Sequence, residues 1–127
     1  MLLNQALIFL SASLFVGGTQ AARFKANEYT DEDCQSDLNY PHTDSTEVTM
    51  DDTSNSVYLA VSHDDQYIWQ AFAGKSGNGG VCEGAVLGNL TTGPGRACNS
   101  LNKSFGQRVK CVKYCSIASG GWPACRH

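Results

Sequence analysis

The sequence lacks a sustained 3.6-residue apolar repeat, so no stretch of it predicts a long amphipathic helix. After residue 21 it also lacks an apolar run of membrane-spanning length, and we expect no membrane span in that part of the chain. What remains are short segments of alternating apolar and polar residues, separated by turn formers. This pattern is typical of β-strands, and it predicts an all-β fold.

Charged residues are absent from the first 21 residues, where an apolar core is followed by the small residues Thr19 and Ala21. The core is too short to cross a bilayer, and small residues at its end are typical of a signal-peptidase site. We therefore interpret residues 1–21 as a secretory signal peptide. The mature chain, residues 22–127, is expected to be one secreted, extracellular domain of about 106 residues.

Residues of the common catalytic motifs are also scarce. The chain has three histidines, no Gly-x-Ser-x-Gly motif and no phosphate-binding glycine loop. Its net charge is −3, whereas nucleic-acid binding needs a dense basic surface, so no nucleic-acid partner is expected. These absences favour a protein that acts by binding, with no catalytic residue and no organic cofactor.

The cysteines are numerous by comparison: six are present, all after the signal segment, and none forms a Cys-x-x-Cys pair. Zinc binding is therefore disfavoured, and three disulfides are expected in an oxidising compartment. The sequence alone leaves several connectivities open. From the proximity of the predicted loops, we expect the pairs Cys82 with Cys98, Cys115 with Cys125, and Cys34 with Cys111.

Two Asn-x-Ser/Thr sequons place Asn89 and Asn102 on exposed loops if glycans are attached there. Near the C-terminus, Trp122 lies in a segment, residues 116–127, that we expect a disulfide to tie to the domain. Packing of this tail is the main role expected for Trp122. Contact with a partner is the alternative, because exposed tryptophans often anchor interfaces.

Eight short strands are predicted in two sets of four. The first set covers residues 22–29, 34–40, 47–50 and 56–61, and the second covers residues 67–72, 81–87, 97–101 and 108–114.

Both sets begin with the same pattern: an aromatic residue, four residues, a second aromatic, one residue, and a corner residue. The pattern reads Phe24, Tyr29 and Asp31 in the first set, and Tyr67, Phe72 and Gly74 in the second. We expect the corner residues to supply the positive φ of a sharp fold in the chain, which glycine adopts freely and aspartate tolerates. The repetition predicts an internal duplication, with units at about residues 22–62 and 66–115.

This doubled pattern, with a Ser-Val strand closing the first unit at Ser56, resembles the Greek-key motif of the βγ-crystallins. The chain departs from the family at Asp31, in place of the first glycine, and at Arg108, in place of the second closing serine. The resemblance implies an all-β, βγ-crystallin-like sandwich of two Greek-key motifs, stabilised here by disulfides.

Secreted microbial members of that fold include killer-toxin-like proteins. The signal segment, the small size and the cysteines also resemble fungal small secreted cysteine-rich proteins, including avirulence effectors. These resemblances imply an exported virulence effector or toxin. Its partner would be an unidentified protein, or a cell-wall or surface target, of a host or competing organism.

The βγ-crystallin family also has a calcium motif: two Asp or Asn, two variable residues, Ser or Thr, then Ser. Residues 51–56 match it except at Asn55, which implies Ca²⁺ ligands from Asp51, Asp52, Ser54 and Ser56. The corresponding loop of the second unit, residues 102–107, has no carboxylate and contains a lysine. A calcium-stabilised structural or stress protein is thus one alternative. In the other, Asp51 and Ser54 only cap the backbone of their own turn.

Tyr40 and His42, with Glu47 downstream, resemble the Tyr-x-His and glutamate of small secreted fungal guanyl-specific ribonucleases. RNA cleavage needs one group to take the 2′-hydroxyl proton and another to protonate the leaving oxygen. His42 with Glu47 or His63 would supply these groups. The alternative is that His42 belongs to an ordinary exposed loop between strands.

Overall fold

The computed structural model describes residues 23–62 and 66–117, and these residues form eight β-strands and no helix. The strands are β1 (Lys25–Tyr29), β2 (Leu38–Tyr40), β3 (Glu47–Thr49), β4 (Ser56–Ala60), β5 (Tyr67–Lys75), β6 (Cys82–Leu90), β7 (Cys98–Ser100) and β8 (Cys111–Ser116). Each predicted strand overlaps one of them, so the all-β class is confirmed. In the described ranges, no helix that could cross a membrane is found.

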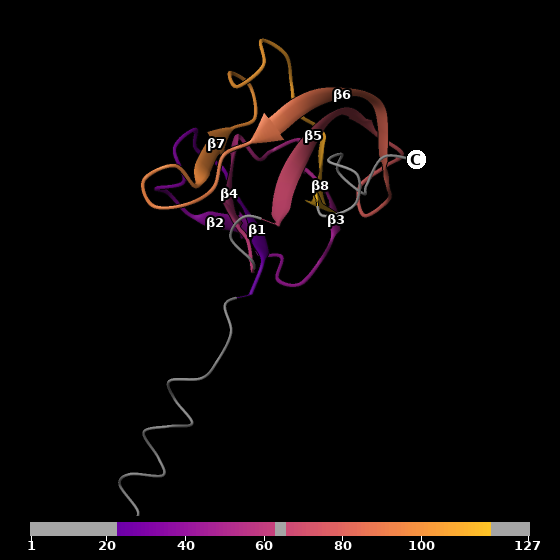
Figure 1. The fold of residues 1–127 in the computed structure, drawn as a ribbon. Helices are drawn as coiled ribbons and strands as arrows, with labels where there is room; N and C mark the ends of the chain where they lie inside the picture. The colour runs from indigo at the N-terminus through magenta and orange to yellow at the C-terminus, as the bar shows by residue number, and fades with distance from the viewer. Residues whose placement is uncertain (1–22, 63–65, 118–127) are drawn as a thin grey trace, which may run out of the picture.

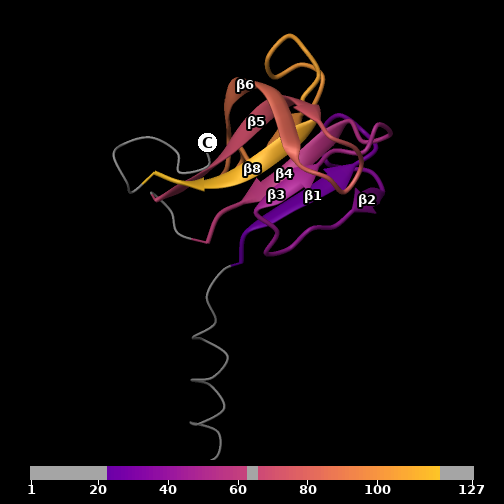
Figure 2. The ribbon, with the colours of Figure 1, turned by 90° about the vertical axis from the view of Figure 1, so that its right-hand side faces the viewer.

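The strands form two antiparallel sheets of four. The first sheet has the order β2-β1-β4-β7, and the second has the order β3-β8-β5-β6. Figure 1 shows the first sheet at the left and the second at the right, and Figure 2 shows the fold from the side of the second sheet. The third strand of each predicted half crosses to the other sheet, because β3 pairs with β8 and β7 pairs with β4.

The core lies between the two sheets. The first sheet contributes Ala26, Val57 and Leu59, and the second contributes Trp69 and other buried side chains. Trp69 is fully buried, and its indole Nε1 donates to the carbonyl oxygen of Ala60, 2.9 Å away, on the opposite sheet. One large side chain thus fills the core and joins both layers without leaving its polar atom unpaired.

Aromatic rings close one end of the core. Phe24 and Tyr67, the first aromatic residues of the two sequence patterns, both stack on the ring of Tyr114. The ring centroids are 4.2 Å apart for Phe24 and 4.8 Å apart for Tyr67. Corresponding positions of the two predicted units therefore meet on one side chain of β8.

The corner residues differ from the prediction, because neither Asp31 nor Gly74 has a positive φ. Glycine is needed at position 74 for space: a Cβ there would lie 3.1 Å from the carbonyl oxygen of Glu83. Positive φ is found at Gly84, on the facing strand, and at the non-glycine residues Cys34 and Asp44. The residue at position 74 is thus constrained by the close approach of the β6 backbone to β5, and not by its own φ angle.

Two disulfides connect the described residues, Cys34 to Cys98 and Cys82 to Cys111. The predicted pairs Cys82 with Cys98 and Cys34 with Cys111 are therefore wrong. The reason is the strand crossing: β7 pairs with β4, so Cys98 lies in the first sheet, beside the loop that carries Cys34. Cys82 and Cys111 belong to β6 and β8, the two neighbours of β5.

Several predictions fall outside the described residues. They concern the signal segment, the partner of Cys115 at Cys125, the tail that contains Trp122, and His63.

Candidate functional site

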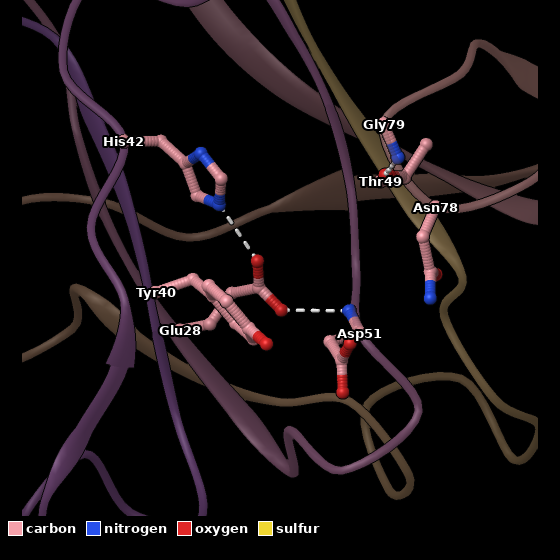
Figure 3. Close-up of a pocket in the computed structure, with 7 residues that line it drawn as sticks. All are labelled: Glu28, Tyr40, His42, Thr49, Asp51, Asn78 and Gly79. Atoms are coloured by element: carbon pink, nitrogen blue, oxygen red, sulfur yellow. Dashed lines mark hydrogen bonds and ion pairs between the residues drawn. The ribbon is translucent and has the colours of Figure 1, made fainter.

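A surface cavity of about 260 Å³ opens where the two sheets meet (Figure 3). The first sheet supplies residues of β1, β2 and the loop after β2, and the second sheet supplies β3 and the turn after β5. The lining residues are Glu28, Tyr40, His42, Thr49, Asp51, Asn78 and Gly79. The strand crossing creates this site, because it brings β3 of the second sheet next to β1, β2 and the loop after β2.

Glu28 is the buried centre of the site. It lies on the same side of β1 as the fully buried Ala26, and only 1% of its surface is exposed. A carboxylate at such a position requires hydrogen-bond donors. Its Oε1 accepts from the backbone N–H of Asp51 and from Ser54 Oγ, both at 2.7 Å, and its Oε2 lies 2.7 Å from His42 Nε2. Glu28 therefore fastens two loops to β1.

His42 is held by its backbone as well as by its ring. Its N–H donates to Asn27 Oδ1 at 3.0 Å, and its carbonyl oxygen accepts from the N–H of Ala26 at 2.9 Å. The imidazole is about 28% exposed, so it lies between the buried Glu28 and the open cavity. The ring is thus fixed in place with one edge available to a ligand.

The structure does not pair His42 with the carboxylate that the sequence suggested. Glu47 instead accepts from the N–H of Cys82 at 2.7 Å and lies 3.8 Å from Lys113 Nζ, within the second sheet. Glu28, the actual partner, was missed by sequence reasoning. A signal existed: a charged residue stands at an inward position of a strand, two residues from a buried alanine.

Four side-chain polar atoms of the lining residues form no hydrogen bond with any residue in the described ranges. They are Tyr40 Oη, His42 Nδ1, Asp51 Oδ2 and Asn78 Nδ2. Tyr40 is 46% exposed, and Figure 3 shows Tyr40 and Asn78 on opposite sides of Asp51. The cavity therefore combines an exposed aromatic ring with unpaired donors and acceptors.

The two carboxylates of the predicted calcium loop are directed to separate partners. Asp51 Oδ1 accepts from the N–H of Thr53 at 2.9 Å and from its hydroxyl at 2.5 Å. These bonds, with the charges of Lys75 and Arg108, lower the pKa of Asp51, so it is ionised at neutral pH. Asp52 lies 3.0 Å from Lys75 Nζ. Asp51 thus caps its own turn, as the second alternative predicted, whereas Ser54, which that alternative also assigned to the turn, donates its hydroxyl to Glu28 instead.

The two serines of that loop are also engaged elsewhere. Ser54 Oγ donates to Glu28, and Ser56 Oγ accepts from the N–H of Cys34 at 3.0 Å. Both serines are fully buried. The four predicted ligands thus have separate partners in the structure.

Two cationic side chains bond the main-chain oxygens of the loop. Lys75 Nζ donates to the carbonyl of Met50 at 2.6 Å, and Arg108 donates to the carbonyl of Asp51 at 2.9 Å. A calcium ion needs six to eight oxygen ligands. The residues in this arrangement do not fit one, since positive charge already binds the oxygens. Elsewhere in the described ranges, no group of three or more His, Cys, Asp or Glu could hold a metal.

The two sequons lie in different surroundings. Asn89 is exposed, as expected, but it belongs to strand β6 rather than to a loop. Asn102 lies in an exposed loop, and its Nδ2 donates to Glu32 and to Asn55, both at 2.8 Å. A glycan fits the surroundings of Asn89 more easily, because the amide nitrogen of Asn102 is already used twice.

Comparison with protein-family models, with curated proteins and with solved structures gives no match for this chain, so the interpretation of the cavity depends on its own geometry.

Proposed function

We propose that this chain is an exported, disulfide-stabilised domain with the βγ-crystallin arrangement of two Greek keys. It acts without catalysis, as an effector or toxin-like protein that binds a target of a host or a competing organism. The uncharged apolar segment of residues 1–21 supports export, and so do the two disulfides, which are rare in reducing compartments.

The sheet order supports the Greek-key assignment. Three strands of the first half have the order β2-β1-β4, and the corresponding strands of the second half have the equivalent order β6-β5-β8. The fourth strand of each sheet is the third strand of the other half: β7 in the first sheet and β3 in the second. The stacking of Phe24 and Tyr67 on Tyr114 agrees with this internal symmetry. Ser56, the closing serine of the first unit, binds the N–H of Cys34 and so secures the folded loop after β1.

The state of Glu28 is the observation that favours binding over catalysis. A carboxylate offers about four lone-pair sites, and Glu28 already meets three donors with them. A general base must reach a substrate proton, whereas Glu28 is 1% exposed. Its bonds instead stabilise the walls of the cavity.

A carboxylate–histidine pair also serves catalysis when the histidine faces a nucleophile. The cavity lining has no serine, cysteine or lysine, and the hydroxyl of Thr49 accepts from the N–H of Gly79 at 2.7 Å. The lining also has no lysine or arginine to hold a phosphate. His42 is therefore suited to contact a ligand rather than to drive a reaction.

The direct test is a dose–response with protein secreted by a eukaryotic host and purified in its oxidised form. Yeast cultures and infiltrated leaf tissue receive the protein, with a reduced and alkylated sample as control. Growth inhibition or cell death that is lost on reduction is the expected result. An equal lack of response to both samples in both systems would refute an effector or toxin role.

The ribonuclease alternative is tested with the wild-type protein and the His42→Ala variant on single-stranded RNA. We expect neither protein to cleave it, because Glu28, the carboxylate beside His42, is 1% exposed and already bonded to three partners, so it does not reach a substrate proton. Cleavage by the wild type that disappears in the variant would contradict a non-catalytic role.

Calcium is tested by thermal unfolding in millimolar CaCl₂ and in excess chelator. A ligand that binds only the native state must raise its stability. We expect the same melting temperature in both, since Lys75 and Arg108 bind the loop oxygens. A clear rise in calcium would favour the calcium-stabilised structural protein instead.

A further inference from the structure

We propose that the cavity binds a neutral carbohydrate, one sugar unit of an oligosaccharide, with adjacent hydroxyl groups between Asp51 and Asn78 and the sugar ring on Tyr40. This inference depends on the proposed function, because it names the ligand class of the same site. Four features of the cavity lining support the inference: its charge, its unpaired polar atoms, its exposed aromatic ring and its rigidity.

The charge of the lining disfavours an anionic ligand. The lining contains the carboxylates of Glu28 and Asp51, one histidine, and neither lysine nor arginine. Lys75 and Arg108 lie close by, but both are engaged with loop oxygens, Lys75 with Asp52 and Met50 and Arg108 with Asp51. The lining itself therefore offers no cation to bind a phosphate, sulfate or carboxylate group, which would meet the charge of Asp51 there.

The unpaired atoms of the lining favour a ligand whose groups both donate and accept hydrogen bonds. Asp51 Oδ2 is an acceptor, Asn78 Nδ2 is a donor, and Tyr40 Oη does either. A cationic ligand would satisfy Asp51 but leave the amide donor of Asn78 without a partner. Sugar hydroxyls satisfy both, because each hydroxyl carries one hydrogen and two lone pairs.

Tyr40 supplies the apolar part of the site. It lies on the short edge strand β2, the residue is 46% exposed, and it is the strand partner of Glu28, whose carboxylate lies at the cavity (Figure 3). An aromatic face covers the C–H groups of a sugar ring while its hydroxyl stays in the polar part of the site. The cavity, about 260 Å³, is smaller than most drug-sized pockets and suits one such unit.

The walls are preorganised. Glu28 fixes His42 and the N–H of Asp51, and Lys75 Nζ holds Asn78 Oδ1 at 2.6 Å, which orients the amide. Groups that are already ordered lose little entropy when a ligand binds.

The test is isothermal titration calorimetry of the secreted, oxidised protein with chitohexaose, laminarihexaose and mannohexaose. A heparin hexasaccharide serves as the anionic probe. The variants are Tyr40→Ala and Asn78→Ala in the cavity, with Tyr58→Ala as the matched control. Tyr58 is a 40% exposed tyrosine of β4 that does not line the cavity. Before the titrations, each variant must have the same melting temperature as the wild type, which shows that it is folded.

We expect at least one neutral oligosaccharide to bind, with affinity reduced about tenfold or more by Tyr40→Ala and by Asn78→Ala, and unchanged by Tyr58→Ala. The inference is overturned if no neutral oligosaccharide binds at millimolar concentration, if heparin binds more tightly, or if both cavity variants bind like the wild type.

The two proposals fail in distinguishable ways. A protein that binds no sugar but still inhibits yeast or kills leaf cells contradicts only the ligand class. A protein that binds sugar through Tyr40 but causes no response contradicts only the effector or toxin role.

Discussion

At the scale of single residues, Glu28 explains the shape of the site. A glutamate on the core-facing side of a strand would normally destabilise the fold, since charge is costly to bury. Here three donors from two loops compensate that cost, and the loops thereby take fixed positions around the cavity. If the cavity binds a ligand as proposed, stability and binding both depend on this side chain.

The first prediction concerns Glu28→Ala. The variant leaves the N–H of Asp51 and the hydroxyl of Ser54 without their acceptor, and an unsatisfied buried donor costs about 1–3 kcal/mol. We expect a loss of roughly 3 kcal/mol or more in the free energy of unfolding, measured in urea. Glu83→Ala, at an exposed glutamate of β6, should change stability by less than about 0.5 kcal/mol. Equal stabilities of the two variants would contradict the assigned role.

The second prediction concerns pH and Glu32. Its carboxylate accepts from Ser100 Oγ at 2.6 Å and from Asn102 Nδ2 at 2.8 Å, and these bonds lower its pKa. Because the folded-state pKa is below the unfolded one, near 4.3, the stabilisation is present above that pH and is lost as the pH falls through the folded pKa.

We therefore expect Glu32→Gln to lose stability at neutral pH and to have a flatter dependence of stability on pH below about 5 than the wild type. Urea unfolding at several pH values measures this. The control is Glu83→Gln, whose side chain has no hydrogen bond within the described ranges, and it should keep the wild-type slope. A wild-type slope in Glu32→Gln would show that the contacts of Glu32 do not persist in solution.

At the scale of elements, the strands were predictable and their partners were not. The alternation expected in residues 67–72 marked β5, and Trp69 and Ala71 of its predicted inner side do join the core. Similar patterns marked the other strands. Pairing between β4 and β7 depends on contacts across the whole chain, which local alternation does not encode. The wrong disulfide pairs followed directly from that missing information.

In the site, too, residues within local motifs were predictable and residues brought in by long-range pairing were not. Tyr40, His42, Asp51 and Asp52 were singled out by local motifs, and the first three do line the cavity. Glu28 and Asn78 come from distant segments that only the strand crossing brings together. The duplication into units at about residues 22–62 and 66–115 stays a prediction that the symmetric sheet order supports.

The third prediction tests the observed connectivity. Peptide mapping of the secreted protein without reduction should recover a Cys34–Cys98 link and a Cys82–Cys111 link. Replacing Cys34 and Cys98 together by serine should lower the free energy of unfolding by about 2–5 kcal/mol, because the bond closes a long loop. Recovery of a Cys82–Cys98 link would contradict the strand order as well as the pairing.

At the scale of the whole molecule, the two halves form one unit. Each sheet needs a strand from the other half, and residues of both sheets share one core. The cavity lies where the two sheets meet, so its walls keep their places as long as the two sheets stay packed together. This arrangement agrees with the proposed role, in which an exported protein keeps one binding surface intact outside the cell.

The central claim is that the protein acts by binding through the cavity. The most direct measurement is the yeast and leaf dose–response of three oxidised proteins with equal melting temperatures: wild type, Tyr40→Ala and Tyr58→Ala. We predict equal potency for the wild type and Tyr58→Ala, and about tenfold or greater loss of potency for Tyr40→Ala. Full potency of Tyr40→Ala would contradict the claim, because the action would then come from another surface.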